Sequence, residues 1–119
     1  MQYLILIYGD EKQYAQMASS EAAQQMYAQF MQYTKDLIGA GVMRVGAELK
    51  PTSTATTVRV RNGKTQVVDG PFAETKEQLG GYYVIDVPNL DEALKWAARC
   101  PGAFSGSVEV RPQGITPDM

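Results

Sequence analysis

The stretch from Gln2 to Tyr8 is apolar at nearly every position, and this restricts the folds that the chain can adopt. Read as a strand, it places Tyr3, Ile5 and Ile7 on one face and Leu4, Leu6 and Tyr8 on the other. Both faces of such a strand need a cover, because apolar surface is driven out of water. Helices of the same chain can cover one face, and we expect a second copy of the chain to cover the other.

The rest of the pattern predicts an α+β domain. Apolar residues recur at helical spacing from Ser20 to Ile38, before Gly39 and Gly41, and a second helix is expected to begin at Asn89. Further strands are expected over 42–49, 56–61, 64–69, 82–87 and 107–111. This order predicts a ferredoxin-like antiparallel sheet with two helices on one face and an inserted β-hairpin, dimerising through the sheet. The domain is expected to span residues 1–112, with a loosely ordered tail over 113–119.

The inserted hairpin has a predictable register. Asn62-Gly63 favours a two-residue type I′ turn, which places Thr56 opposite Asp69 and Val58 opposite Val67. Asp69 is then on the same side as the apolar residues Val58, Val60 and Val67. The other side carries the basic residues Arg59, Arg61 and Lys64.

A corner, Asp69-Gly70-Pro71-Phe72, follows the hairpin and precedes the next strand. Glycine and proline interrupt a ladder, and Asp69 is expected to accept backbone N–H bonds from the turn after it. In a functional interpretation, Asp69 is a candidate catalytic group that transfers a proton, while Lys76 or an arginine stabilises negative charge. In a structural interpretation, Asp69 caps the turn and residues 74–77 form a solvated face. The candidate ligand-binding residues are Tyr8, Arg59, Asp69, Pro71, Phe72, Glu74, Lys76 and Tyr82.

Tyrosines give a second hypothesis for a site. Tyr3, Tyr8, Tyr82 and Tyr83 could line an aromatic pocket at a sheet interface, with hydroxyls that orient a small polar ligand. The alternative is that their rings only pack a dimer, since strands favour aromatic residues in any case.

Composition excludes several classes of function. The chain has no histidine, the commonest general base at neutral pH, so a hydrolase triad is not expected. A net charge of -2 argues against direct binding of nucleic acid. No metal-ligand spacing, cofactor motif, membrane span or secretory signal is found, and we expect a cytoplasmic protein without metal or cofactor. Cys100 is expected to be a small buried residue on the inner face of a helix.

The corner also resembles a known family. Asp69-Gly70-Pro71-Phe72, followed by Ala73-Glu74-Thr75-Lys76-Glu77 and Gly80-Gly81, is similar to the hallmark of the DGPF-domain branch of the YCII-related proteins. Residues 55–64, 91–98 and 107–112 resemble the family's hairpin, last helix and last strand. The resemblance implies a ferredoxin-like fold that dimerises through its sheet, with a pocket near the interface. Family members with a proposed active site pair a histidine with an aspartate, and this chain has no histidine.

Three functions remain open from the sequence. The first is a homodimeric protein that binds a small polar metabolite near the dimer interface. The second is an isomerase or lyase that uses Asp69 with lysine or arginine for proton transfer, by analogy of fold. The third is a regulatory accessory protein with a protein partner in transcription, because relatives in this family are often linked with alternative sigma factors.

Overall fold

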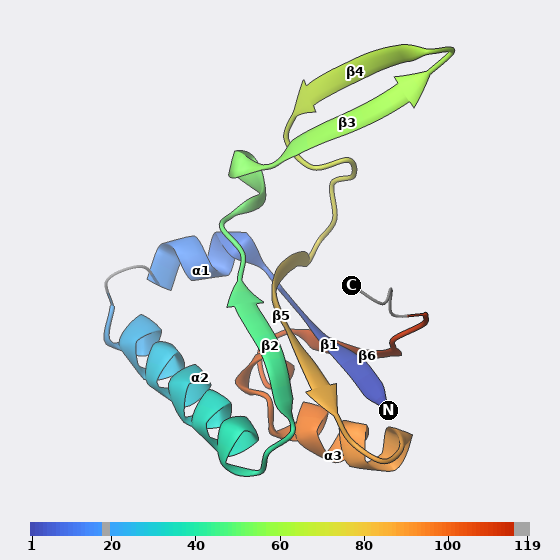
Figure 1. Cartoon of the computed structure of the whole chain (residues 1–119). Helices are drawn as coiled ribbons and strands as arrows, with labels where there is room; N and C mark the ends of the chain where they lie inside the picture. Colours follow the sequence, from blue (N-terminus) through green and yellow to red (C-terminus); the bar gives the residue numbers. More distant parts are fainter. Residues whose placement is uncertain (18–19, 116–119) are drawn as a thin grey trace.

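The computed structural model describes residues 1–17 and 20–115. Along the chain the elements are β1 (Gln2–Gly9), α1 (Glu11–Met17), α2 (Glu21–Gly39), β2 (Met43–Glu48), η1 (Thr52–Thr54), β3 (Thr56–Arg61), β4 (Lys64–Asp69), β5 (Gln78–Asp86), α3 (Leu90–Arg99), η2 (Pro101–Ala103) and β6 (Ser107–Pro112) (Figure 1). Residues 116–119, the end of the expected tail, lie outside the described ranges.

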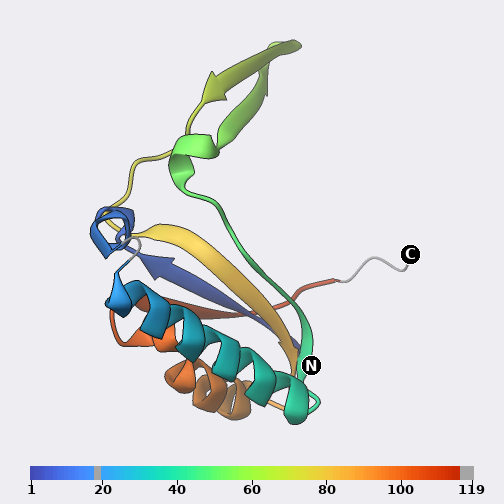
Figure 2. The ribbon, with the colours of Figure 1, turned by 90° about the vertical axis from the view of Figure 1, so that its left-hand side faces the viewer.

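An antiparallel sheet forms the body of the molecule, and its strand order is β2-β5-β1-β6. Helices α2 and α3 lie against one face of this sheet, and the opposite face has no helix over it (Figure 2). Strands β3 and β4 form a separate two-stranded sheet that projects from one end of the body (Figure 1). The predicted α+β, ferredoxin-like fold with an inserted hairpin is thereby confirmed.

The core lies between the sheet and the helices. Its buried residues are Tyr3, Ile5 and Ile7 of β1, Tyr33 and Leu37 of α2, Tyr83, Ile85 and Val87 at β5, and Ala93, Ala97 and Cys100 at α3. The Tyr33 ring meets Tyr83 and Trp96 edge to face, and its hydroxyl donates a 2.8 Å hydrogen bond to the Trp96 carbonyl. Burial raises the pKa of Tyr33 well above its ordinary value, so this hydroxyl stays protonated and remains a donor.

Helix ends follow the sequence closely. Ser20 caps α2 by accepting a hydrogen bond from the Ala23 N–H, and Asn89 caps α3 by accepting one from the Glu92 N–H. In α3, the helical spacing of Leu90, Ala93, Leu94, Ala97 and Cys100 predicts an inward-facing stripe. For Leu90 and Leu94 this prediction is wrong, because each is 47% exposed. The helix instead buries small side chains, which let its backbone approach the sheet.

Helix α1 was not expected from the sequence, because its residues EKQYAQM show no apolar stripe and none is buried. Contacts from other parts of the chain hold it in place. The Glu11 N–H donates to Gln78 Oε1 of β5 at 3.0 Å, and the Glu11 carboxylate accepts hydrogen bonds of 2.8 and 2.7 Å from the Thr52 N–H and hydroxyl. These bonds connect α1 to β5 and to the segment that leads into the projecting hairpin.

Gly106 offers a direct test of the packing at the start of β6. A Cβ added there would overlap the backbone carbonyl oxygen of Tyr8, which cannot move without breaking the sheet. We expect Gly106→Ala to lower the free energy of unfolding by about 1–3 kcal/mol, measured by urea denaturation. Gly114→Ala is the matched control, since no atom lies within 4 Å of its Cβ position. Equal stability of the two variants would contradict this account of the contact.

Candidate functional site

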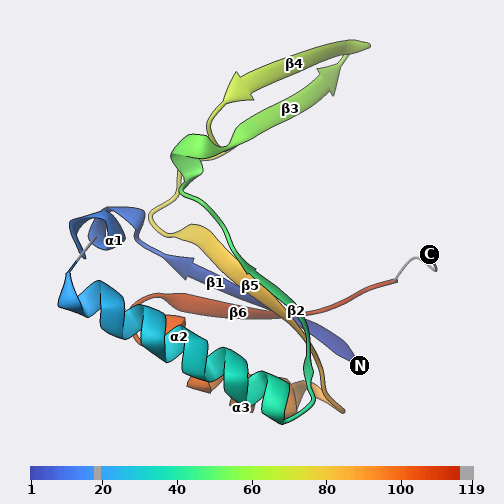
Figure 3. The same ribbon diagram turned by 60° about the vertical axis from the view of Figure 1, so that its left-hand side comes forward.

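The sheet face opposite the helices is not covered by any described element (Figure 3). Its apolar residues, here called the open face, are Leu4, Leu6, Tyr8, Val45, Ala47, Tyr82 and Val84. On the same side of the sheet, β6 contributes the polar residues Ser107, Glu109 and Arg111. The strand register brings the apolar residues together, since Leu4 pairs with Val84 and Leu6 with Tyr82. Strand β2 extends the same surface, because Val45 also pairs with Val84. A single chain therefore leaves a continuous apolar layer in water.

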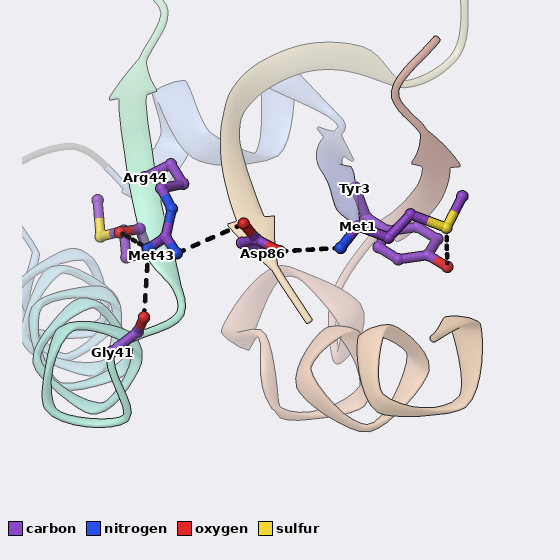
Figure 4. Close-up of polar contacts among 6 residues, drawn as sticks. All are labelled: Met1, Tyr3, Gly41, Met43, Arg44 and Asp86. Carbon is purple, nitrogen blue, oxygen red and sulfur yellow. Dashed lines mark hydrogen bonds and ion pairs between the residues drawn. The ribbon is translucent and has the colours of Figure 1, made fainter. Parts of the chain in front are cut away.

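Charged groups flank the open face. The Asp86 carboxylate lies between the Met1 amino group, at 2.9 Å, and the Arg44 guanidinium, at 3.5 Å (Figure 4). Along β6, Arg111 pairs with Glu109. An apolar centre with paired charges at its edge is the usual composition of a protein–protein interface.

The hairpin has the expected register. Thr56 pairs with Asp69, Val58 with Val67 and Arg61 with Lys64, and Asn62 and Gly63 have φ of 53° and 75°. This agrees with the predicted type I′ turn. The division into a valine side and a basic side is thereby confirmed.

The corner after β4 is held by backbone groups. Gly70 has φ of 99°, a conformation that favours glycine. Its N–H donates a 2.7 Å hydrogen bond to the Ala55 carbonyl, and its carbonyl accepts one of 2.8 Å from the Thr57 hydroxyl. The expectation that Asp69 accepts N–H bonds from this turn is wrong. The Ala55 carbonyl takes the N–H of Gly70 instead, and within residues 1–17 and 20–115 the exposed Asp69 carboxylate has no hydrogen-bond partner.

A shallow hollow lies on the basic side of the hairpin, next to this corner. Its lining residues, here called the corner hollow, are Thr57, Arg59, Gln66, Val68, Pro71 and Phe72, and its volume is about 100 Å³. The Phe72 side chain is 78% exposed, although it belongs to the corner motif. The hollow thus combines a guanidinium group, a side-chain amide and an aromatic ring, which suit an anionic or planar group.

The structure divides the candidate ligand-binding residues among separate places. Arg59, Pro71 and Phe72 meet in the corner hollow. Asp69 is on the valine side of the hairpin, and Glu74 and Lys76 lie on the exposed loop between β4 and β5. Tyr8 and Tyr82 belong to the open face. Within one chain, these groups do not form a single site.

The four tyrosines do not share one pocket, which corrects the hypothesis of a common aromatic site. Tyr3 and Tyr83 are 3% and 8% exposed and point into the core below the helices. Tyr83 also shares a 2.7 Å hydrogen bond with the Thr34 hydroxyl of α2. Tyr8 and Tyr82 lie on the opposite side of the sheet, because residues an odd number of positions apart on a strand face opposite ways.

A larger hollow, of about 280 Å³, lies between α2 and the segment after α3. It is lined by Gln29, Gln32, Tyr33, Asp36, Arg99, Pro101 and Phe104. Its charged groups already have partners, since Arg99 pairs with Asp36 at 2.9 Å and lies 4.4 Å from the centre of the Trp96 ring. No pattern in the sequence indicated this hollow, because its walls come from segments about 60 residues apart that meet only when the helices pack.

Among residues 1–17 and 20–115, no three His, Cys, Asp or Glu side chains lie close enough to hold a metal ion. None of the helices in those ranges has the length and hydropathy of a transmembrane span.

Asp86 makes the acid sensitivity of the fold testable. The hydrogen bond from the Met1 amino group, together with the charge of Arg44, lowers the pKa of Asp86 below its ordinary value of 3.8. Because this pKa is lowered in the folded protein, the ionised carboxylate stabilises the fold at pH values above its ordinary pKa. The stabilisation is lost as the pH falls through the pKa that Asp86 has in the folded protein. We expect Asp86→Asn to lose less stability than wild type between about pH 5 and pH 2, measured by denaturant titration at each pH. Asp69→Asn controls for the loss of one negative charge, and an unchanged slope in Asp86→Asn would contradict the assignment.

Comparison with known proteins identifies the family. The family model described as YCII-related domain matches residues 1–113. A protein of Rhizobium meliloti (strain 1021), named Uncharacterized protein R00369, is 42% identical over 117 residues, which cover 97% of this chain and 94% of that protein. The resemblance noted at the corner therefore extends over the whole described fold, and the chain belongs to the YCII-related family.

Proposed function

We propose that this chain is a homodimeric binding protein for a small polar metabolite that carries an anionic group. The observation that carries the proposal is the corner hollow, where Arg59, Gln66 and Phe72 converge beside the motif that marks the family branch. A guanidinium group recognises carboxylate or phosphate through paired hydrogen bonds, and an aromatic ring can stack on the remainder of the ligand. The proposed location is the cytoplasm.

The size of the hollow limits the part of the ligand that it can hold. Sites for whole drug-sized molecules usually measure about 300–1,000 Å³, whereas this hollow measures about 100 Å³. It fits one compact group, such as a carboxylate or a phosphate. The rest of the metabolite would extend along the exposed ring of Phe72.

The open face supports the dimer in this proposal. Leu4, Leu6 and Val84 lie at the centre of a layer that the chain's own helices do not cover, and a twofold axis would pack two such layers together. The flanking pairs of Asp86 and of Arg111 would then lie at the rim of the interface.

Binding is favoured over proton transfer by the positions of the charged groups. Asp69 and Arg59 are on opposite sides of the hairpin, so one ligand in the corner hollow cannot contact both within a single chain. General acid–base catalysis needs its carboxylate within hydrogen-bond reach of the reacting proton. The arrangement therefore supports a binding protein more than an isomerase or a lyase.

The ligand site is tested by a thermal-shift screen of small carboxylates and phosphates. We expect at least one to raise the melting temperature of the wild type, and Arg59→Gln to weaken its binding about 10-fold to 100-fold, because a hydrogen bond to a charged group is lost. Arg61→Gln is the control, since Arg61 is on the same side of the hairpin but does not line the hollow. Equal affinities of the two variants, or no stabilising compound in the screen, would overturn the site.

The dimer is tested by light scattering and sedimentation equilibrium. We expect the wild type to have twice the 13.1 kDa mass of one chain. Leu6→Arg should give monomers, because it places a charge at the centre of the open face. Leu94→Arg, on the outer surface of α3 where Leu94 is 47% exposed, should remain a dimer. A monomeric wild type would exclude this interface.

A further inference from the structure

The projecting hairpin, residues 56–69, is here called the arm. We propose that the valine side of the arm, formed by Val58, Val60 and Val67, docks on the second copy of the chain in the homodimer. This inference rests on the dimer proposed above. It adds a second contact surface, which lies outside the open face.

The arm lacks a cover of its own. Val58, Val60 and Val67 are 60%, 58% and 62% exposed, and Val68 on the other side is 60% exposed. A hairpin of only two strands is marginally stable in water unless a third element packs on it. Its exposed valines therefore favour a partner surface.

The overall dimensions agree with an arm that extends away from its own body. The radius of gyration of the Cα atoms is 16.3 Å, whereas a compact chain of this length is expected to have about 13.5 Å. The larger value agrees with a hairpin that projects from the body, as Figure 1 shows.

The direction of the arm points to the second copy. In Figures 2 and 3 the arm leans toward the side of the open face, away from α2 and α3. Strands as long as β3 and β4 span about 20 Å, whereas packed sheets lie about 10 Å apart. A second copy placed on the open face would therefore come within reach of the arm.

Hydrogen bonds hold the two segments that connect the arm to the rest of its own chain. The Glu11 carboxylate accepts a hydrogen bond from the Thr52 N–H. The side chain of Gln78 accepts a hydrogen bond from the Glu11 N–H and donates one of 2.5 Å to the Thr75 carbonyl. Thr52 lies before the arm and Thr75 after it, so both connecting segments are tied to the same helix and strand. A braced arm loses less conformational freedom when it docks than a loose one would.

Charge supports the second copy as the occupant. The arm carries Arg59, Arg61 and Lys64 against Asp69, a net charge of +2, while the whole chain has 11 basic and 13 acidic residues. The rest of the chain is therefore net −4. Arg59, Arg61 and Lys64 lie on the side opposite the valines, so this charge would draw the arm toward an acidic second copy at long range and would not pair across the docked surface. The symmetry of a dimer gives the contact twice.

The direct test uses a dimer mixed from ¹³C-labelled and unlabelled wild-type chains. Isotope-filtered nuclear Overhauser spectra detect only contacts between different chains. We expect cross-chain signals from the methyl groups of Val58, Val60 and Val67, and from Leu6 of the open face. Leu37, which is 0% exposed in the core, should give none. Cross-chain signals from Leu6 without any from the valines would overturn the arm and leave the proposed dimer standing.

A pair of variants separates docking from damage to the hairpin. Val60→Gln places a polar side chain on the valine side, and Arg61→Gln places the same side chain on the opposite side of the same strand, at a residue that does not line the corner hollow. We expect Val60→Gln to raise the Kd of the dimer at least 10-fold, measured by sedimentation, and Arg61→Gln to change it less than 3-fold. Equal effects of the two variants would overturn the inference, and so would a monomeric wild type, which would also exclude the proposed dimer.

Discussion

The structure depends on the central strand β1, which is apolar on both of its faces. Its odd-numbered residues pack under α2 and α3, where Ile5 is fully buried, and its even-numbered residues form the middle of the open face. Strands β5 and β6 flank it, so its backbone groups are paired within the sheet. The helices of the same chain cover one face of this strand. Burial of the other face requires a second molecule, and this need is the physical basis of the proposed dimer.

In the DGPF corner, backbone hydrogen bonds hold the turn, and the side chains of Asp69 and Phe72 stay available for binding. Gly70 takes a positive φ, and its N–H and carbonyl are satisfied by Ala55 and Thr57. Neither the Asp69 carboxylate nor the Phe72 ring is used in holding the turn. The exposed Phe72 ring can therefore stack on a ligand in the corner hollow without loss of a contact that holds the turn.

Local patterns predicted most of the fold. The start of α3 at Asn89 and the Asn62-Gly63 turn depend on neighbouring residues only, and the sequence located both correctly. Helix α1 was missed because Glu11 holds it through bonds to distant residues. The role of Asp69 was wrong because Pro71, two positions later, has no N–H to donate, and the Gly70 N–H is bonded to the distant Ala55 carbonyl. The tyrosine hypothesis failed for a reason visible in the sequence, since Tyr82 and Tyr83 are adjacent on one strand and must face opposite ways.

The two sides of the arm connect the proposed ligand site with the proposed dimer contact. A two-stranded sheet has no interior, so Arg59 on one side and Val58 on the other are separated only by the backbone that carries both. A ligand held by Arg59 and Phe72 would order the same strands whose valines meet the partner. Linkage is reciprocal, so a ligand that favours the ordered arm must tighten the dimer by the factor by which the dimer tightens the ligand. An arm that is marginal by itself is well suited to such coupling, because either contact can supply the order that the other needs.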